Sequence, residues 1–402
     1  MTRRSSINSF TLVELLIVIA ILAILAATVV IVINPSELIS QARDTQRITD
    51  MKAMRSAIDI IIANDPAVSD GADNTVYISI PSNSATCVGV SGLPTLPAGW
   101  SYACVSAANL TKVDATGWIP INFNTSSNSI NLPALPIDPI NDASSGKYYT
   151  YATGGSYELT ALLESQKKHD VAVSDGGSLP GVLQMGSHID LTPVVRDNGL
   201  VGLWRFDEGT GTTSADASGK WGVATLAGAA WSSSCKRGYC LSFDGIDDNA
   251  SIAAKTANFS TVHGPASLLV WFNPSSITGT HSMFGDSSPE FQMYTSDATA
   301  YGRTNNTVQM GTVSIGNWYF GAVTHDHPMG LINTVIRTYL NGDFIAQGNW
   351  SFGGQNGYSN ESYYIGGYSG DANFFQGMID EIRIYNRALS ADEVKVIYNA
   401  TK

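Results

Sequence analysis

The chain opens with one long apolar segment and then changes its pattern. Residues 15–33 carry no charged side chain, and a helix of this length spans about 28 Å, close to the roughly 30 Å of a bilayer's hydrocarbon core. From Leu38 to Ile61 apolar residues recur at helical spacing, with charged residues between them. Pro35 interrupts this helix, and Asn64-Asp65-Pro66 ends it. The pattern predicts a membrane helix that continues outside the bilayer as an amphipathic helix.

Short apolar runs bounded by turn residues follow this helix. They lie at 76–80, 99–105, 117–123, 147–153 and 156–164. Runs of this length, rich in aromatic and β-branched residues, are typical of strands. We expect a small antiparallel sheet and name residues 65–196 the head. Asp138-Pro139 and Asn141-Asp142 favour a turn over a metal site.

The rest of the chain has a stronger strand pattern. Strand-length runs lie at 200–207, 239–245, 266–274, 317–323, 334–340, 362–368 and 378–385. Asn341-Gly342 predicts a hairpin, because a type I′ turn needs positive φ at both central residues. Only the tail is helical, since Ser390 and Glu393 are spaced as a capping box. We expect an all-β, two-sheet jelly roll and name residues 200–402 the sandwich.

Charge and composition narrow the function. The chain has 34 acidic and 22 basic residues, a net charge of −12, and no basic cluster. Nucleic acid is therefore not expected as a partner, because phosphate binding needs clustered Lys and Arg. With 44% hydrophobic and 14% charged residues the chain is not a disordered polymer.

The four cysteines form two local pairs. Cys87 and Cys104 make one pair, and Cys235 and Cys240 make the other. No CxxC motif occurs and the histidines are scattered, so a zinc site is disfavoured. Arg3 and Arg4 precede the apolar segment, which keeps the short N-terminal stretch cytoplasmic and places everything after residue 34 outside. The two pairs are then the natural disulfides, although three connectivities are open.

Phe10-Thr11-Leu12-x-Glu14 before the apolar run resembles the class III signal of type IV pilins and pseudopilins. The resemblance implies a leader at 1–9, a filament-core helix at 10–64 and an α+β pilin fold. A prepilin peptidase would cut between Ser9 and Phe10 and methylate the new amine. Ser9 departs from the family's usual glycine. Glu14 would then pair with the Phe10 amine of a neighbouring pilin subunit, in a helix otherwise surrounded by inner-membrane lipid.

The sandwich resembles a laminin-G-like, concanavalin A-like jelly roll. The matching segments are Gly202–Gly209, Asp216–Gly219, Leu241–Gly245, Tyr339–Gly342 and Gly377–Ser390. This fold hosts both lectin-like binders and glycosidases, so it does not decide function. The family's hydrolases carry Glu-x-Asp-x-x-Glu on one strand, and no Glu of this chain has Asp two residues later. We therefore do not expect an enzyme.

Calcium is the cofactor that this resemblance implies. In many relatives one calcium ion joins the first and last strands of the sandwich. The resemblance implies that Asp216 and Asp380 are the carboxylate ligands here, with Asp207 as a weaker third ligand. The alternative is that Asp207 and Asp380 cap turns or accept backbone N–H groups. His325-Asp326-His327 favours a solvated loop over a transition metal. An aromatic group near expected loops offers a ligand surface; its members are Tyr358, Tyr363, Tyr364, Tyr368, Phe374 and Phe375.

Three functions remain open. The leading hypothesis is a membrane-anchored minor pilin that presents the sandwich on an extracellular filament, for adhesion to a glycan or a protein. The first alternative is a pseudopilin of a type II secretion or DNA-uptake machine. The second, a membrane-anchored glycan-processing enzyme, is weakened by the missing carboxylate motif.

Overall fold

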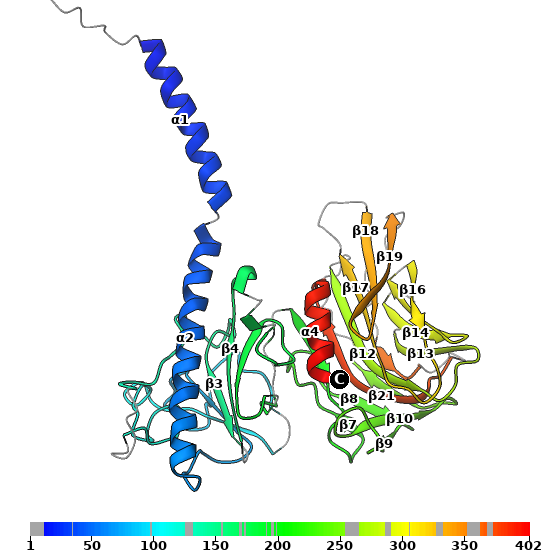
Figure 1. Ribbon diagram of the computed structural model, residues 1–402. Helices are drawn as coiled ribbons and strands as arrows, with labels where there is room; N and C mark the ends of the chain where they lie inside the picture. Colours follow the sequence, from blue (N-terminus) through cyan, green and yellow to red (C-terminus); the bar gives the residue numbers. More distant parts are fainter. Residues whose placement is uncertain are drawn as a thin grey trace, which may run out of the picture.

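The computed structural model describes most of the chain. The described residues are 12–33, 35–96, 99–124, 132–153, 156–168, 171–172, 174–189, 191–193, 197, 199–253, 265–285, 291–304, 306–326, 333–351, 362–367 and 373–402. The first element is a helical stalk in two pieces, α1 (Leu12–Ile33) and α2 (Pro35–Asn64) (Figure 1). Pro35 is the first residue of α2, where its missing N–H is not needed. The predicted break at Pro35 and the end at Asn64 are confirmed.

The head contains one five-stranded sheet with the order β2-β1-β3-β4-β5. Its strands are β1 (Thr75–Ile78), β2 (Ser101–Ala103), β3 (Thr150–Thr153), β4 (Tyr157–Leu162) and β5 (Val182–Gly186), with a 3-10 turn η1 (Gln166–Lys168) after β4. All neighbours are antiparallel except β1 and β2, which are parallel. The expectation of a wholly antiparallel sheet is therefore wrong at that edge.

One predicted strand is absent from the described head. Residues 117–123 make only an isolated bridge between Asp114 and Asn122. The run is apolar because Trp118, Ile119, Ile121 and Phe123 are buried in the head core. Pro120 lacks the N–H that a ladder would need at this point. Burial without strand pairing explains the apolar pattern.

The stalk and the head are joined by packing and by charge. The buried face of α2, formed by Met51, Met54, Ile58 and Ile61, shares one core with aromatic residues of β3 and β4 (Figure 1). Above that core, Arg47 of α2 is fully buried and reaches three carboxylates. These are Asp44, Asp138 and Glu164. The predicted Asp138-Pro139 turn is therefore joined to α2 by an ion pair between Asp138 and Arg47.

The geometry of this cluster supplies hydrogen-bond acceptors to the buried guanidinium group. Arg47 donates to both oxygens of Asp138 at 2.6 and 2.8 Å, a two-point pairing that suits the planar guanidinium. Burial opposes the charge of Arg47, but the hydrogen bonds that it donates to Asp138, Asp44 and Glu164 raise its pKa. Burial alone would raise the pKa of Glu164, yet Arg43, Arg47 and Lys147 lower it to about 2. Arg47 and Glu164 are thus both charged at neutral pH.

The sandwich consists of two eight-stranded sheets. The first has the order β19-β18-β17-β12-β21-β10-β9, with β6 also paired to β21. Its strands are β6 (Leu200–Trp204), β9 (Ala230–Ser232), β10 (Cys240–Asp244), β12 (Ala266–Pro274), β17 (Tyr319–Asp326), β18 (Asn333–Leu340), β19 (Asp343–Ser351) and β21 (Gln376–Tyr385). Every strand-length run predicted in residues 200–402 overlaps one of the strands of the two sheets.

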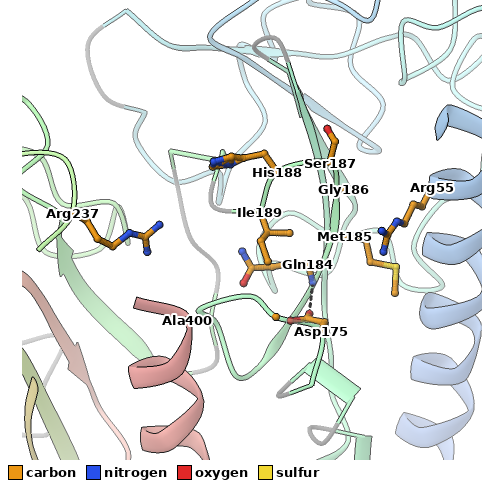
Figure 2. Close-up of a pocket in the computed structure, with 11 residues that line it drawn as sticks. Arg55, Asp175, Gln184, Met185, Gly186, Ser187, His188, Ile189, Arg237 and Ala400 are labelled. Carbon is orange, nitrogen blue, oxygen red and sulfur yellow. Dashed lines mark hydrogen bonds between the residues drawn. The ribbon is translucent and has the colours of Figure 1, made fainter. Parts of the chain in front are cut away.

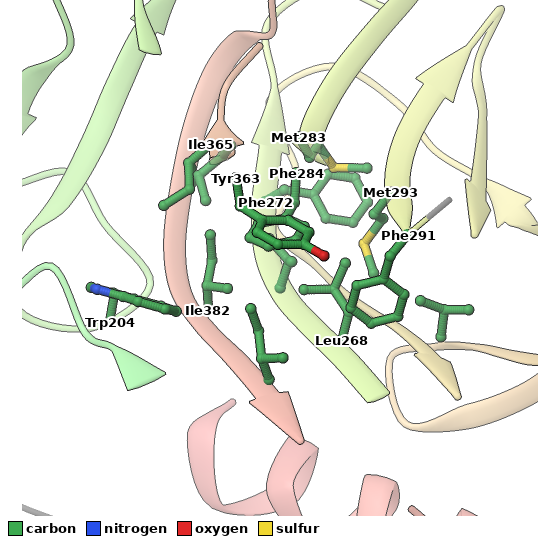
Figure 3. Packing of buried hydrophobic residues seen from close by; sticks show 14 of the residues in the cluster. Trp204, Leu268, Phe272, Met283, Phe284, Phe291, Met293, Tyr363, Ile365 and Ile382 are labelled. Atoms are coloured by element: carbon green, nitrogen blue, oxygen red, sulfur yellow. The ribbon is translucent and has the colours of Figure 1, made fainter. Parts of the chain in front are cut away.

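The second sheet has the order β16-β15-β14-β13-β20-β11-β8-β7. Its strands are β7 (Thr213–Ser214), β8 (Ala224–Ala227), β11 (Asn249–Ile252), β13 (Thr280–Gly285), β14 (Gln292–Ser296), β15 (Thr299–Thr304), β16 (Asn306–Thr312) and β20 (Tyr363–Ile365). The two sheets enclose the main core, in which Phe272, Phe284 and Tyr363 pack closely (Figure 3). The described pairs of both sheets are antiparallel, as the jelly-roll prediction requires.

The first sheet is covered on both faces. All nine residues of β12 are buried. Leu268 and Val270 face the main core, whereas Leu269 and Trp271 belong to an outer cluster with Val394 and other residues of α4 (Ala391–Thr401). Ser390 and Glu393 form the predicted capping box of α4. Figure 1 shows α4 on the side of the sandwich that is turned towards the head.

The head contributes directly to this outer cluster. Leu179 and Val182 are buried in it, and Leu162 packs against it. Polar contacts accompany the packing, since the Tyr385 hydroxyl donates to Asp197, whose other oxygen accepts the Gly181 N–H. Burying a large apolar side chain contributes about 1.5–3 kcal/mol. The head and the sandwich are therefore docked through a shared apolar core.

Candidate functional site

Two of the predicted calcium ligands, Asp207 and Asp380, lie in one small pocket of about 180 Å³. Its walls come from the end of β6, from β21, from the head and from residues 235–240, which we call the disulfide loop. The lining residues are Ser178, Arg205, Asp207, Arg237, Gly238, Asp380, Glu381 and Arg383. The pocket brings three arginines together with three carboxylates, and we call it the arginine–carboxylate pocket.

A β-bulge in β21 allows two successive carboxylates to line this pocket. Val270 of β12 pairs with Ile382 and Trp271 pairs with Asp380, so Glu381 is the extra residue. Successive residues of a regular strand point to opposite faces, and a bulge removes that restriction. Glu381 has a φ of 40°, which is uncommon for a residue with a side chain. Such conformations cluster at functional sites.

Arg383 holds Glu381 in this position and also reaches the head. Its Nε donates to Glu381 at 2.6 Å, and its Nη2 donates to the same oxygen. Its Nη1 donates to the backbone carbonyl of Ser178. Because Arg383 is only 2% exposed, this is a buried link between the last long strand of the sandwich and the head.

The carboxylates of the pocket hold the disulfide loop. Asp380 accepts the Arg237 N–H at 3.0 Å, and Asp207 accepts the Tyr239 N–H at 3.2 Å. Burial raises the pKa of Asp380 to about 8, with the Glu381 and Asp207 carboxylates adding to the effect and the Arg237 N–H opposing it. Burial also raises the pKa of Asp207. Both residues act as acceptors of backbone N–H groups, which was the alternative to calcium binding.

Asp216 does not join Asp207 and Asp380, and it does not line their pocket. Its two oxygens accept six hydrogen bonds, five from backbone N–H groups and one from the Ser218 hydroxyl. Ser218, Lys220, Trp221 and Gly222 lie in the turn between β7 and β8, whereas the remaining donor, Leu203, lies in β6. A carboxylate whose lone pairs are taken in this way does not fit a calcium ligand. Among the described residues, the predicted three-carboxylate set therefore does not converge on one ion.

A different acidic group lies closer together. Asp244, Asp247 and Asp248, at the turn between β10 and β11, form the one carboxylate cluster compact enough to hold an ion among the residues that the structure describes. Asp244 accepts the Ile246 N–H, and Asp248 accepts the Asp244 N–H, so the group also shapes the turn. Calcium binding stays a prediction.

Comparison with known families identifies the two ends of the chain. Residues 4–30 match the model of the prokaryotic N-terminal methylation motif, and residues 244–395 match that of the concanavalin A-like lectin/glucanases superfamily. The chain carries a type IV prepilin signal and a laminin G-like domain. Both sequence resemblances and the predicted fold class are confirmed. The comparison with curated protein sequences gave no match.

Similar solved structures resemble the chain only at the level of fold. Domain 4 of AbnA, a GH43 arabinanase of Geobacillus stearothermophilus, is 19% identical, covers 50% of this chain and 99% of its own, and gives a TM-score of 0.39. Trypanosoma rangeli sialidase is 15% identical with coverages of 62% and 44% and a TM-score of 0.41. The binding domain of Paraclostridial Mosquitocidal Protein 1 is 13% identical with coverages of 50% and 52% and a TM-score of 0.41. The chain thus spans about half of the last two structures.

The prepilin signal lies partly outside the described residues. Ser9 and Phe10, the predicted cleavage pair, belong to that part, whereas Glu14 lies in the first turn of α1. The side chains of α1 from Leu12 to Leu22 are exposed. Among the helices of the described residues, none combines the length and the apolar character needed to cross a membrane. The membrane span stays a prediction.

Both predicted disulfides of the chain are formed. Cys87 is joined to Cys104 in the head, and Cys235 is joined to Cys240 in the laminin G-like domain. The second bond closes the loop that carries Arg237 and Gly238 into the arginine–carboxylate pocket. This disulfide therefore supports a site, which the cysteine spacing alone did not indicate.

Other expected positions are corrected. His325 is 1% exposed inside β17, so it does not lie in a solvated loop, and His327 lies outside the described residues. Tyr363 and Phe375 are buried in the main core of the laminin G-like domain, which removes them from the expected aromatic surface. Tyr364 and Phe374 are partly exposed, and Tyr358 and Tyr368 are outside the described residues.

Proposed function

We propose that the chain is a pilin-like subunit of a surface filament whose laminin G-like domain binds a glycan for adhesion. The observation that supports this proposal is the presence on one chain of the N-terminal methylation motif and the concanavalin A-like lectin/glucanases domain. The first is a signal for processing and assembly of pilins. The second is a fold used to bind carbohydrate.

Assembly would begin with cleavage between Ser9 and Phe10 by a prepilin peptidase. The exposed apolar side chains of α1 then need an apolar environment, which lipid supplies before assembly and neighbouring stalks supply afterwards. Glu14 would pair with the Phe10 amine of a neighbouring subunit, because a carboxylate among apolar side chains needs a cation. This pairing sets the register of one subunit on the next.

The size of the sandwich favours a minor or terminal subunit. Residues 200–402 add about as much chain as the stalk and head together. A domain of this size on every subunit would crowd a packed filament. We therefore place the chain where few copies are needed, with the sandwich exposed to a surface ligand.

We propose binding rather than catalysis. Retaining glycosidases need two carboxyl groups about 5–5.5 Å apart that can protonate and attack the sugar. In the arginine–carboxylate pocket Glu381 is paired to Arg383, and Asp380 and Asp207 accept backbone N–H groups. Because these contacts already use the carboxylates to hold Arg383 and the disulfide loop, they support a binding domain rather than a catalytic one.

The assembly part is tested with Glu14→Gln in the full chain, expressed with a prepilin peptidase and its filament system. We expect cleavage and membrane insertion as in the wild type, but loss of the chain from sheared filaments, because the neutral amide cannot pair with the Phe10 amine. The control is Glu37→Gln, since Glu37 lies in α2 and contacts Ser165 of its own chain. Equal incorporation of Glu14→Gln and the wild type would contradict the pairing.

The binding part is tested with a glycan array probed by the purified full chain in detergent micelles. We expect retention on a subset of glycans, and competition by the same free glycans. Absence of binding to every glycan on an array of neutral and acidic sugars would overturn the adhesive proposal, while leaving the prepilin signal untouched.

A further inference from the structure

A second, larger cleft of about 430 Å³ lies between the stalk, the head and the sandwich (Figure 2). Ligand sites commonly measure about 300–1,000 Å³ and often lie between domains. Arg55 comes from α2, Ile189 follows β5, Arg237 comes from the disulfide loop and Ala400 comes from α4. The remaining lining residues are Asp175, Gly176, Gln184, Met185, Gly186, Ser187 and His188. We call this space the junction cleft.

The junction cleft is lined by more arginines than carboxylates, although the protein is acidic. The chain has a net charge of −12, yet the cleft is lined by two guanidinium groups, one imidazole and a single carboxylate. That carboxylate, Asp175, accepts the Gly177 N–H and the Gln184 N–H, each at 2.7 Å. The two backbone N–H dipoles therefore partly compensate the negative charge of Asp175. Arg55 also pairs with Asp59 at 3.6 Å, and Arg237 also lines the arginine–carboxylate pocket. The lining still holds more arginines than carboxylates, and an excess of one sign attracts ligands of the other.

The two arginines are carried by well-fixed elements. Arg55 lies on α2, whose neighbouring turns are buried against the head sheet. Arg237 lies on the disulfide loop, which the Cys235–Cys240 bond closes and which Asp380 holds through the Arg237 N–H. Figure 2 shows Arg237 at one side of the view and Arg55 at the other, with His188, Ile189 and the strand that carries Gln184 and Gly186 between them. An extended anion could meet one arginine at each end.

We propose that the junction cleft is a binding site for an acidic oligosaccharide, whose carboxylates pair with Arg55 and Arg237. This inference rests on the proposed function and names its ligand class. Guanidinium groups bind carboxylates through two parallel hydrogen bonds, and an oligosaccharide with a carboxylate on each sugar offers several such groups along its length. The exposed imidazole of His188 and hydroxyl of Ser187 supply further polar contacts for sugar hydroxyls.

One consequence is that the ligand would be held by both halves of the molecule. Arg55 belongs to the stalk, and Arg237 belongs to the sandwich. Neither half alone presents both guanidinium groups. A bound chain would therefore bridge the junction and stabilise the docked arrangement of head and sandwich.

The test uses the full chain in detergent micelles with two probes, an oligogalacturonate and the matching neutral galactose oligomer. We expect the acidic oligomer to bind and the neutral oligomer not to bind. Arg55→Gln and Arg237→Gln should each lower affinity for the acidic oligomer about tenfold or more, because each removes a charged hydrogen-bonding group. Arg337→Gln, on β18 and away from the cleft, is the matched control and should bind like the wild type.

The outcomes separate the two proposals. If acidic glycans bind equally well to the wild type, Arg55→Gln and Arg237→Gln, the junction cleft is not the site, whereas glycan binding stands. If neutral glycans bind and acidic ones do not, the ligand class is wrong. If the wild type binds no glycan at all, the proposed function itself fails. Unchanged melting temperatures of the variants show that a loss of affinity is not a loss of folding.

Discussion

Arg47 is a charged side chain without exposure to solvent. It is fully buried and forms ion pairs with Asp44, Asp138 and Glu164. Removing one member of a buried ion cluster leaves the others uncompensated, which typically costs about 3–5 kcal/mol. We expect Arg47→Met to lower the free energy of unfolding by this amount in urea denaturation.

Arg43→Gln is the matched control for Arg47. Arg43 pairs with the same Glu164, but its side chain is 28% exposed. Exposed pairs contribute about 0–1 kcal/mol, so the control should stay close to the wild type. Similar losses for both variants would mean that burial does not set the importance of Arg47.

Asp380 gives the folded chain a specific pH dependence. Its pKa is about 8 in the folded state and near 3.8 when the chain is unfolded. The unfolded state therefore releases the proton first, and stability falls as pH rises from about 4 to about 8, with a limiting slope near 1.4 kcal/mol per pH unit. Asp380→Asn keeps an acceptor for the Arg237 N–H but does not ionise. We expect it to melt higher than the wild type at pH 8 and similarly at pH 4.

The same measurement examines the calcium hypothesis. If Asp380 held calcium, chelation would lower the melting temperature of the wild type, and Asp380→Asn would lose that response and melt lower at pH 8. A higher melting temperature without any effect of chelator agrees with a buried, proton-binding carboxyl group.

At the scale of elements, the β18–β19 hairpin combines a backbone requirement with a packing requirement. Asn341 and Gly342 have φ values of 54° and 77°, as the type I′ prediction requires. A Cβ on Gly342 would lie 2.8 Å from Cδ1 of Tyr398 in α4. We expect Gly342→Ala to cost about 2–4 kcal/mol, because backbone strain and overpacking add.

Gly316 is the control for the hairpin glycine. Its φ is 75°, yet a Cβ there would meet no atom within 4 Å. Gly316→Ala should therefore lose only about 1 kcal/mol, the backbone part. Equal losses in chemical denaturation would show that α4 yields to the added methyl group.

The elements also show how far sequence patterns predict this fold. The stalk, the hairpin and the long strands were predictable, because periodicity and turn residues act locally. Residues 117–123 were not, since apolar side chains mark burial as well as strand pairing. The parallel pairing of β1 with β2 depends on contacts between distant segments, which no local pattern encodes.

The candidate site was predictable only in part. Asp207 and Asp380 were found because they belong to the laminin-G-like segments. Glu381 needs a bulge to reach the pocket, and a bulge leaves no local signature here. Arg383, the one basic residue of a strand run that also carries Asp380 and Glu381, was the available signal for a buried ion pair. Arg55 and Arg237 meet only through tertiary docking.

At the scale of the whole molecule, the shared outer cluster couples head and sandwich. Leu179 and Val182 are buried with Trp271, Leu203 and residues of α4. We expect the wild type to unfold in a single calorimetric transition, because each half stabilises the other. Leu179→Asp places a charge in this cluster and should split the transition into two.

Val88→Asp is the control for the docking experiment. Val88 is 75% exposed, so an added carboxylate there remains hydrated and the single transition should be kept. Two transitions in the wild type would show that the halves unfold independently despite their contact.

The position of Glu164 has a mechanical consequence. It lies two residues after β4 and pairs with Arg43 and Arg47 of the stalk. β4 is hydrogen-bonded to β5, whose Val182 is buried in the outer cluster of the sandwich. In the proposed filament, tension between the fibre and a bound surface ligand would pass from the stalk to the sandwich through these contacts. The Glu164 ion pairs and the β4–β5 hydrogen bonds would carry this load together. We therefore expect the head and the sandwich to resist traction as one body.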